Sequence, residues 1–254
     1  MKVVSKAFFV SAPIASAMIG CIATVAQGGV IDVANNSFES PTVAPYPALL
    51  TAPPWNMNGY GTVYEPFGPG TGTVAAGVGI FTNPSSGSGG HLNNVDGNQL
   101  AYMFNNDGNS ISQGLVNPGN TNQATTFQAG QSYTLTVAAA NATAAPGPTS
   151  KLFVDLYYVD GNGKHNVAET VLDPSMLSGT QVADFSTSPT GLLLAGDAAV
   201  GKQINVGMFA SGPGGGEFDV DNVRVTAVPE PASLGLLGVG AASLFLRRRR
   251  AEQE

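Results

Sequence analysis

The sequence predicts an all-β protein whose body is a single β-sandwich with an apolar segment at each end. Apolar residues in the body recur at every second position far more often than at helical spacing. Clusters of Gly, Pro and Asn separate these short runs, as turns separate strands. No stretch before Pro231 has a helical pattern longer than a turn or two. Short strands with turns between them are typical of a sandwich, and 254 residues leave room for one such body.

The clearest strands lie in the second half of the body. In "YTLTV", residues 133–137, apolar side chains alternate with threonines, so one face of the strand is apolar. The run that begins at Lys151 alternates in the same way and ends at Asp160-Gly161-Asn162-Gly163, which has the composition of a hairpin turn. Further predicted strands are "VIDVA" from Val30, "NQLAYMF" from Asn98, "SISQGLV" from Ser110, "QINVGMF" from Gln203 and "FDVDNVRV" from Phe218.

The last predicted strand contains a break in its alternation. Phe218 and Val220 share a face, but the next apolar residue, Val223, follows three positions later instead of two. One extra residue at Asp221-Asn222 indicates a β-bulge. We expect such a bulge to free backbone groups beside the acidic side chains of this strand.

The segment from residue 41 to residue 90 is rich in Pro, Gly and Ser and predicts long loops with one or two strands, "GTVYEPF" and "AAGVGIF". Its aromatic residues Trp55, Tyr60 and Tyr64 lie in a neutral setting. Exposed rings there would offer flat apolar faces to sugars, which makes these three residues the predicted ligand-binding set. In the alternative interpretation, Trp55 fills the core and the tyrosines cover a sheet edge.

The N-terminal end, residues 1–26, has the layout of a secretory signal peptide. Lys2 and Lys6 precede a long apolar stretch, and small residues precede the predicted cleavage after Ala26. A short membrane anchor and a lipoprotein signal lipidated at Cys21 are the alternatives. Cys21 is the only cysteine, so a chain cleaved at Ala26 can form neither a disulfide nor a cysteine-based metal site.

The charge of the body limits its partners. Residues 27–228 carry fourteen acidic and four basic side chains. This balance repels phosphate backbones, which makes nucleic acid an unfavourable partner. Acidic, oxygen-rich loops are compatible with divalent cations.

The sequence contains no recognisable catalytic motif. It has no nucleophile elbow, no pair of zinc-binding histidines on a helix and no phosphate-binding loop. His91 and His165 are both predicted to lie in loops. Four glutamates could supply a carboxylate pair for glycoside hydrolysis, although nothing in the sequence brings two of them together: Glu39, Glu65, Glu169 and Glu217. We therefore predict that the protein is not an enzyme.

In the C-terminal segment, residues 229–250, a Pro-Glu-Pro triplet precedes a predicted apolar helix at residues 232–246, and four arginines follow it. This segment resembles the PEP-CTERM sorting signal of Gram-negative bacteria. Fifteen helical residues span about 22 Å, short for a membrane core of about 30 Å. The arginines would stay in the cytoplasm, which places the body at residues 27–228 outside. The predicted sorting residues are Pro229, Glu230, Pro231, Arg247, Arg248, Arg249 and Arg250.

This resemblance implies a transient inner-membrane anchor. It further implies recognition by an exosortase, which removes the tail and passes the body to the cell surface or the extracellular matrix. Secretion machinery, the exosortase and the inner membrane are thus the expected partners, with extracellular polysaccharide as a further one.

Two motifs, "NNSFES" near the start of the body and "GGGEFDVDNVRV" near its end, are similar to the opening and closing strands of jelly-roll carbohydrate-binding modules. This resemblance implies that the single β-sandwich is jelly-roll-like. In such modules an opening Glu and a closing Asp help to hold a structural calcium ion. The resemblance implies this role for Glu39 and Asp221.

Taken together, these observations predict an exported, surface- or matrix-associated protein that binds glycans or acts as an adhesin without catalysis. A purely structural matrix protein and a polysaccharide-acting enzyme are the two alternatives.

Overall fold

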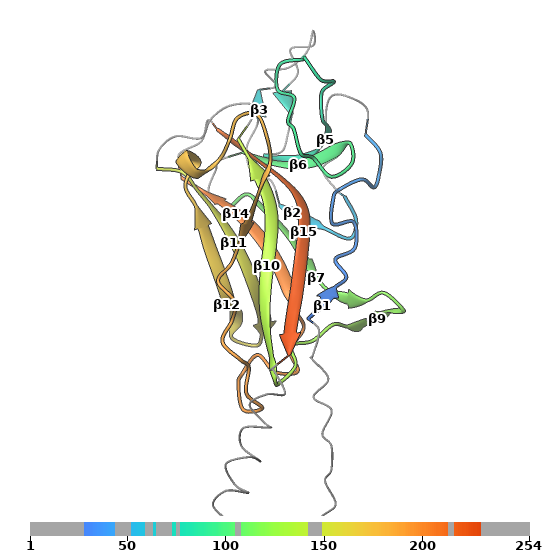
Figure 1. The fold of residues 1–254 in the computed structure, drawn as a ribbon, viewed down its shortest axis with the longest axis vertical. Coiled ribbons are helices and arrows are strands. Elements are labelled where there is room, and N and C mark those ends of the chain that lie inside the picture. The colour runs from blue at the N-terminus through green and yellow to red at the C-terminus, as the bar shows by residue number, and fades with distance from the viewer. Residues whose placement is uncertain are drawn as a thin grey trace, which may run out of the picture. The chain divides into compact units, whose positions relative to one another are not determined.

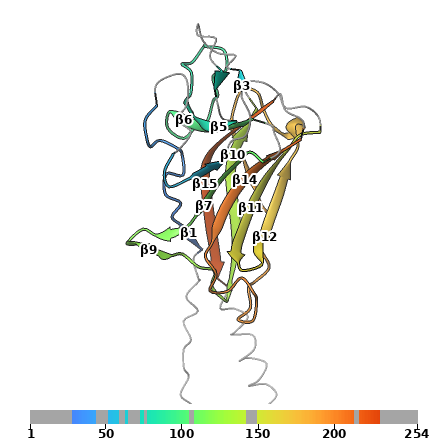
Figure 2. The same ribbon diagram turned by 180° about the vertical axis from the view of Figure 1, so that it is seen from behind.

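Two antiparallel sheets enclose a common apolar core, as the alternation in the sequence predicts (Figures 1 and 2). The computed structural model describes residues 28–43, 52–58, 63–64, 73–74, 77–104, 108–141, 149–212 and 216–229. All of them belong to one compact unit, Ala26–Glu230. A second unit, Met1–Val25 with Pro231–Glu254, contains none of the described residues. The all-β sandwich is thus confirmed, while the two flanking helices lie outside the described residues.

The first sheet, sheet A, has the strand order β13-β10-β15-β6-β5, and β1 pairs with the far end of β15. Its strands are β1 (Gly29–Ile31), β5 (Val78–Thr82), β6 (Gln99–Phe104), β10 (Gln131–Ala140), β13 (Ala183–Ser186) and β15 (Glu217–Pro229). The second sheet, sheet B, has the order β12-β11-β14-β7-β2. Its strands are β2 (Asn56–Asn58), β7 (Ser110–Gly114), β11 (Lys151–Asp160), β12 (Gly163–Leu172) and β14 (Asn205–Ser211).

Smaller elements complete the described part of the chain. β3 (Val63–Tyr64) pairs with β4 (Thr73–Val74), and β8 (Val116–Asn117) pairs with β9 (Asn120–Ala124). The helical content of the described residues is one short 3-10 turn, Pro174–Met176. A membrane-crossing helix is not found among the described residues, and both predicted apolar segments lie outside them.

The core lies between the sheets and uses alternate residues of each strand. Leu135 of β10 and Val225 of β15 are fully buried, and across the core so are Leu156 of β11 and Met208 of β14. Because successive side chains of a strand point to opposite faces, the residues between them lie on the outer faces of the sandwich. Those outer faces carry polar side chains, such as Asp155 of β11 and Ser112 of β7.

The predicted bulge is present in β15. Thr136 of β10 pairs with Arg224, but Ala138 pairs with Asp221, so β15 has one extra residue between these pairs. Asn222 there has a φ of 46°. The backbone N–H of Val223 donates a hydrogen bond of 2.9 Å to the carbonyl of Asn36, outside the sheet. The bulge therefore connects the last strand to the N-terminal segment.

The outer face of sheet A is partly covered by the connection between β5 and β6. A second buried cluster on this face consists of Leu92, Leu100, Ala138, Ala140 and Val182. Asn93 joins the connection to the segment before β13, because its N–H donates to the carbonyl of Thr180 and its carbonyl accepts from the N–H of Val182. The sequence did not predict that the β5–β6 connection covers this face, because the connection has little apolar periodicity.

Candidate functional site

The predicted aromatic ligand set is not exposed at Trp55. This side chain is 3% exposed, and its ring centroid lies 5.1 Å from that of Phe38. Its Nε1 donates a 2.9 Å hydrogen bond to the carbonyl of Asn35. Trp55 thus fills the core, and the expectation that it presents its ring to a ligand is wrong. Tyr60 lies outside the described residues, and of Tyr64 only the backbone, in β3, is described.

The two predicted metal ligands, Glu39 and Asp221, bind the same short loop. Asp221 Oδ2 accepts a 2.7 Å hydrogen bond from the backbone N–H of Asp96. Glu39 Oε1 accepts bonds of 2.8 and 2.7 Å from the backbone N–H groups of Asn98 and Gln99. The loop at residues 96–99 is therefore held between an acid of the N-terminal segment and an acid of the last strand.

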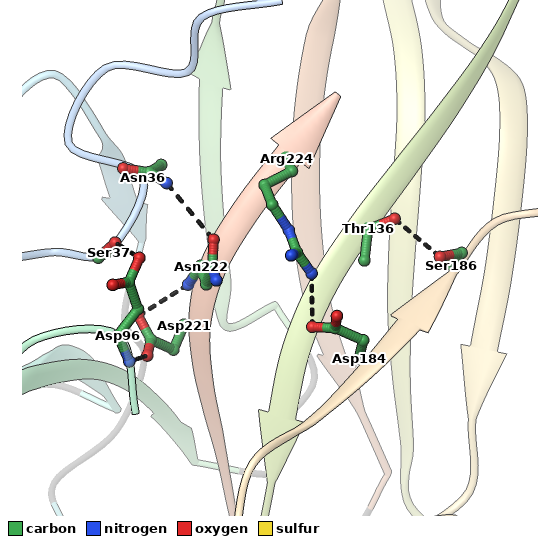
Figure 3. Close-up of polar contacts among 9 residues, drawn as sticks. All are labelled: Asn36, Ser37, Asp96, Thr136, Asp184, Ser186, Asp221, Asn222 and Arg224. Atoms are coloured by element: carbon green, nitrogen blue, oxygen red, sulfur yellow. Dashed lines mark hydrogen bonds and ion pairs between the residues drawn. The ribbon is translucent and has the colours of Figure 1, made fainter. Parts of the chain in front are cut away.

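Asp96 adds a third carboxylate to this acidic site. Its Oδ2 accepts a 2.7 Å hydrogen bond from the Ser37 hydroxyl, and Asn36 donates to the Asn222 side chain at 3.5 Å (Figure 3). The sequence signal at Asp96 was its Asp-Gly-Asn triplet, which predicts only a turn. Because the loop and the bulge come from distant parts of the chain, their meeting could not be read from local pattern.

Burial dominates the electrostatics of the acidic site. The pKa of Asp221 is raised to about 7, chiefly by burial, and the charges of the nearby Asp96 and Glu39 contribute to this rise. The backbone N–H groups of Asp96 and Asn222 oppose this shift by stabilising the carboxylate. The oxygen donors fit the preference of Ca²⁺. Within the described residues, however, no three His, Cys, Asp or Glu side chains form a group arranged to hold a metal.

A different set of side chains lies on the outer face of sheet B. The strand registers place residues of all five strands in rows across this face. One row contains Val171, Phe153, Phe209, Ser110 and Asn58. The next contains Glu169, Asp155, Gly207, Ser112 and Asn56. One side of the face thus combines aromatic and aliphatic groups with the carboxyl groups of Asp155 and Glu169, and hydroxyls and amides occupy the other side.

Lys164 lies over the aromatic part of this face. Its Nζ is 3.6 Å from the ring centroid of Phe209 and 4.7 Å from that of Tyr157, and it pairs with Asp155. Gly207 makes this arrangement possible, because a Cβ there would lie 2.8 Å from the Phe209 ring. The sequence analysis missed this group, whose signal was the aromatic alternation in "LFVDLYYV".

A buried acid lies on the outer side of sheet A. Asp219 is fully buried and pairs in register with Tyr102 of β6. The Tyr102 ring contacts two others, with centroids 6.2 Å away at Phe81 and 5.7 Å away at Phe104. Gly79 leaves room for it, since a Cβ there would lie 2.8 Å from the hydroxyl. Asp219 is therefore a buried acid opposite a tyrosine that belongs to an aromatic cluster, and a carboxyl group in such a setting can act as a general acid.

His91 lies in a loop as predicted, whereas the prediction of a loop is wrong for His165, which belongs to β12. His165 stacks on Tyr158 with centroids 4.8 Å apart, and its Nε2 lies 2.9 Å from Asp160 Oδ1. His91 Nδ1 lies 2.6 Å from the carbonyl of Pro84.

Of the four glutamates named above, the three that the structure describes belong to three different segments. Glu169 belongs to β12 of sheet B and Glu217 to β15 of sheet A. Glu39 binds the loop at residues 96–99, and Glu65 lies outside the described residues.

Comparison with known families accounts for both the body and the tail. The profile described as HpiC1-like, HpiC1 cyclase, matches residues 29–226. The chain belongs to the HpiC1-like family. The PEP-CTERM protein-sorting motif matches residues 227–250, which marks this HpiC1-like protein as an exported chain that an exosortase sorts to the cell surface. No curated protein sequence matches the chain.

Solved structures share the fold of this HpiC1-like body. A Stig cyclase, FisC from Fischerella sp. TAU in complex with (3Z)-3-(1-methyl-2-pyrrolidinylidene)-3H-indole, is 20% identical with a TM-score of 0.56. The match covers 80% of this chain and 100% of that one. A cyclase from Fischerella sp. TAU in complex with 4-(1H-indol-3-yl)butan-2-one is 21% identical to this chain, with a TM-score of 0.52. This match covers 80% of this chain and 98% of that one.

The likeness to carbohydrate-binding modules is more distant. The CBM22-1 xylan-binding domain from Paenibacillus barcinonensis Xyn10C is 12% identical with a TM-score of 0.43, over 81% of this chain and 99% of that domain. A score of this size carries no argument about function.

Proposed function

We propose that the HpiC1-like body is a surface-displayed binding protein that takes up polysaccharide on the outer face of sheet B. The observation that carries this proposal is the pair of residue rows across that sheet. A tail that delivers the body to the cell surface places such a face where polysaccharides occur. Binding without catalysis is the function that we assign to this face.

The chemistry of the rows suits a neutral, hydroxyl-rich ligand. Phe153 and Phe209 are partly exposed neighbours on adjacent strands, and their rings can cover the apolar faces of sugar units. The amides of Asn56 and Asn58 are exposed along the edge strand β2 and can bond sugar hydroxyls. Between them Ser112 is partly exposed. A row from rings to amides can therefore contact several sugar units in succession.

We expect Phe209→Ala to weaken polysaccharide binding at least about tenfold, because a central aromatic contact typically contributes more than about 1.4 kcal/mol. Depletion of the purified protein by a panel of insoluble and immobilised polysaccharides measures the effect. The matched control is Phe81→Ala, which removes a partly buried ring from the outer side of sheet A. Equal weakening by both variants, or no binding by the unaltered protein, would contradict the proposal. The predicted ligand residues Tyr60 and Tyr64 are tested in the same assay.

A second candidate function is a cyclase-like enzyme that uses Asp219. The family match and the buried acid beside Tyr102 favour it. This function predicts that 4-(1H-indol-3-yl)butan-2-one, the compound in the related structure, binds with measurable heat in calorimetry. Asp219→Asn should then weaken binding about tenfold or more, because a hydrogen bond to a charged group contributes about 1.5–3 kcal/mol. Phe209→Ala should leave it unchanged. A structural matrix protein, the third alternative, predicts no binding in either assay.

We also propose that a structural calcium ion binds at Glu39, Asp96 and Asp221, completed by backbone oxygens. Glu39 and Asp221 accept hydrogen bonds from the same short loop, and the nearby Asp96 and Glu39 contribute to the raised pKa of Asp221, which supports this proposal. The ion would supply positive charge between the N-terminal segment and the last strand, which the bulge already joins. The melting temperature with Ca²⁺ and with chelator, at pH 5 and pH 8, tests this proposal.

A further inference from the structure

The sorting motif overlaps the last strand of the body. The motif matches residues 227–250, whereas β15 extends from Glu217 to Pro229. Residues 227–229 therefore belong to both the motif and the strand, and Pro229 is the first residue of the Pro-Glu-Pro triplet. The segment that an exosortase recognises thus begins inside a β-sheet and not in a free linker.

Neighbouring strands lie on both sides of this overlap (Figure 1). On one side, residues 131–133 of β10 pair with residues 227–229 in antiparallel register. On the other side, Gly29 of β1 pairs with Ala227. The start of the motif is therefore the middle strand of three at this end of sheet A.

Packing and hydrogen bonding hold the overlap in the sheet. Ala227 is buried and belongs to the apolar core between the sheets. The hydroxyl of Ser132 donates a hydrogen bond of 3.5 Å to the carbonyl of Val228. Gly28 lies so close that a Cβ there would be 3.1 Å from the Val228 side chain. Release of residues 227–229 from the sheet therefore has a free-energy cost, as local opening of a packed strand has in general.

This pairing competes with recognition of the motif by an enzyme. Enzymes and domains that bind an extended peptide commonly do so through its main-chain hydrogen-bonding groups. A backbone N–H that pairs within the sheet cannot donate to an enzyme at the same time. When opening is fast relative to cleavage, the rate follows the equilibrium population of the open form.

We propose that the folded body limits its own processing, because residues 227–229 must leave the sheet before the exosortase can act on the motif. In the closed form these residues are paired with β10 and β1. In the open form their backbone is available to the exosortase, which supplies the chemistry. Processing of the folded chain is then slower than processing of the same motif outside a sheet.

A disulfide that keeps the segment in the sheet tests the proposal in a host that contains the exosortase. Ser132→Cys with Val228→Cys, in a Cys21→Ser chain, places two thiols directly opposite each other on one face of the sheet, where a disulfide can form. Export delivers the pair to an oxidising compartment. We expect pulse-chase labelling to show processing at least about tenfold slower than in the unaltered chain, because the open form is no longer populated. Reductant should restore the rate.

The matched control is Val228→Cys alone in the Cys21→Ser chain, which makes the same change in the motif without the cross-link. Equal processing rates for the control and the cross-linked chain, with the disulfide verified by thiol alkylation, would overturn the proposal. That result would show that the exosortase acts before the body folds or without opening of the sheet.

A second variant moves the motif out of the sheet. A ten-residue Gly-Ser linker and a second copy of residues 227–229, inserted after Pro229, leave β15 intact and give the exosortase an unpaired motif. We expect processing at least about threefold faster than in the unaltered chain, because opening is no longer required. The same linker inserted at Gly196, in an exposed turn, is the control. An unchanged rate in the motif variant, or no processing of any chain, would contradict the proposal.

Discussion

Trp55→Ala should lower the free energy of unfolding by about 3–5 kcal/mol, the usual cost of removing a large buried ring. Trp55 is 3% exposed and its ring lies against Phe38, which is fully buried. The indole Nε1 also donates to the carbonyl of Asn35, so the ring joins two segments that belong to no long strand. Chemical denaturation in urea, followed by far-ultraviolet circular dichroism, measures the change.

Two further variants distinguish the stability contributed by the buried ring from that contributed by its hydrogen bond and from the effect of removing any apolar side chain. Trp55→Phe keeps most of the buried ring and removes the N–H donor, so it should cost about 1 kcal/mol beyond repacking. Val159→Ala removes apolar atoms from a side chain that is 56% exposed and should change stability by less than about 0.5 kcal/mol. A Trp55→Ala variant as stable as the Val159→Ala variant would contradict the placement of Trp55 in the core.

Stability should fall as pH rises from about 4 to about 7, and Asp221 should account for a large part of this loss. Its pKa is about 7 in the folded protein and 3.8 in the reference state, so the folded state holds the extra proton in this window. Below pH 3.8, Asp221 is protonated in both the folded and the unfolded state, and its full contribution to the free energy of unfolding is present. Above pH 7, Asp221 is ionised in both states and this contribution is lost. The full difference is about 4 kcal/mol at most. The midpoint of urea unfolding across this range measures it.

Asp221→Asn should flatten the profile, because the amide does not titrate. Asp155 has a pKa shift in the same direction, so a residual slope is expected in this variant. A slope equal to that of the unaltered protein would contradict the assignment to Asp221.

The effect of Ca²⁺ on the melting temperature, measured at two pH values, tests the calcium proposal. A bound cation favours the ionised carboxylate, so Ca²⁺ should raise the melting temperature more at pH 8 than at pH 5. Glu39→Ala should lose most of this increase. An unchanged melting temperature at pH 8, relative to chelator, would reject the calcium proposal and leave the pH prediction intact.

Much of the fold was predictable because strands and turns are local. The alternation in residues 133–137 predicted part of β10, and Asp160-Gly161-Asn162-Gly163 predicted the turn between β11 and β12, where Gly163 has a φ of 110°. The bulge in β15 followed from one misplaced apolar residue. The polar hairpin of β8 and β9 was missed, because its strands bury almost nothing and so lack alternation.

The candidate sites were less predictable, because each combines residues from distant strands. Alternation shows that a side chain faces inward or outward, but it does not show which strand lies beside it. The sequence left Trp55 either as an exposed ligand-binding residue or as a core residue, and long-range packing against Phe38 decides for the core.

By itself, the sequence determined the sandwich class, the bulge and the sorting tail, since each depends on neighbouring residues alone. Only the tertiary structure decided that Lys164 lies on the Phe209 ring beside Asp155, and that the loop at residues 96–99 meets Asp221. Strand order is set by burial summed over the whole core, so no single segment contains the information that brings these groups together.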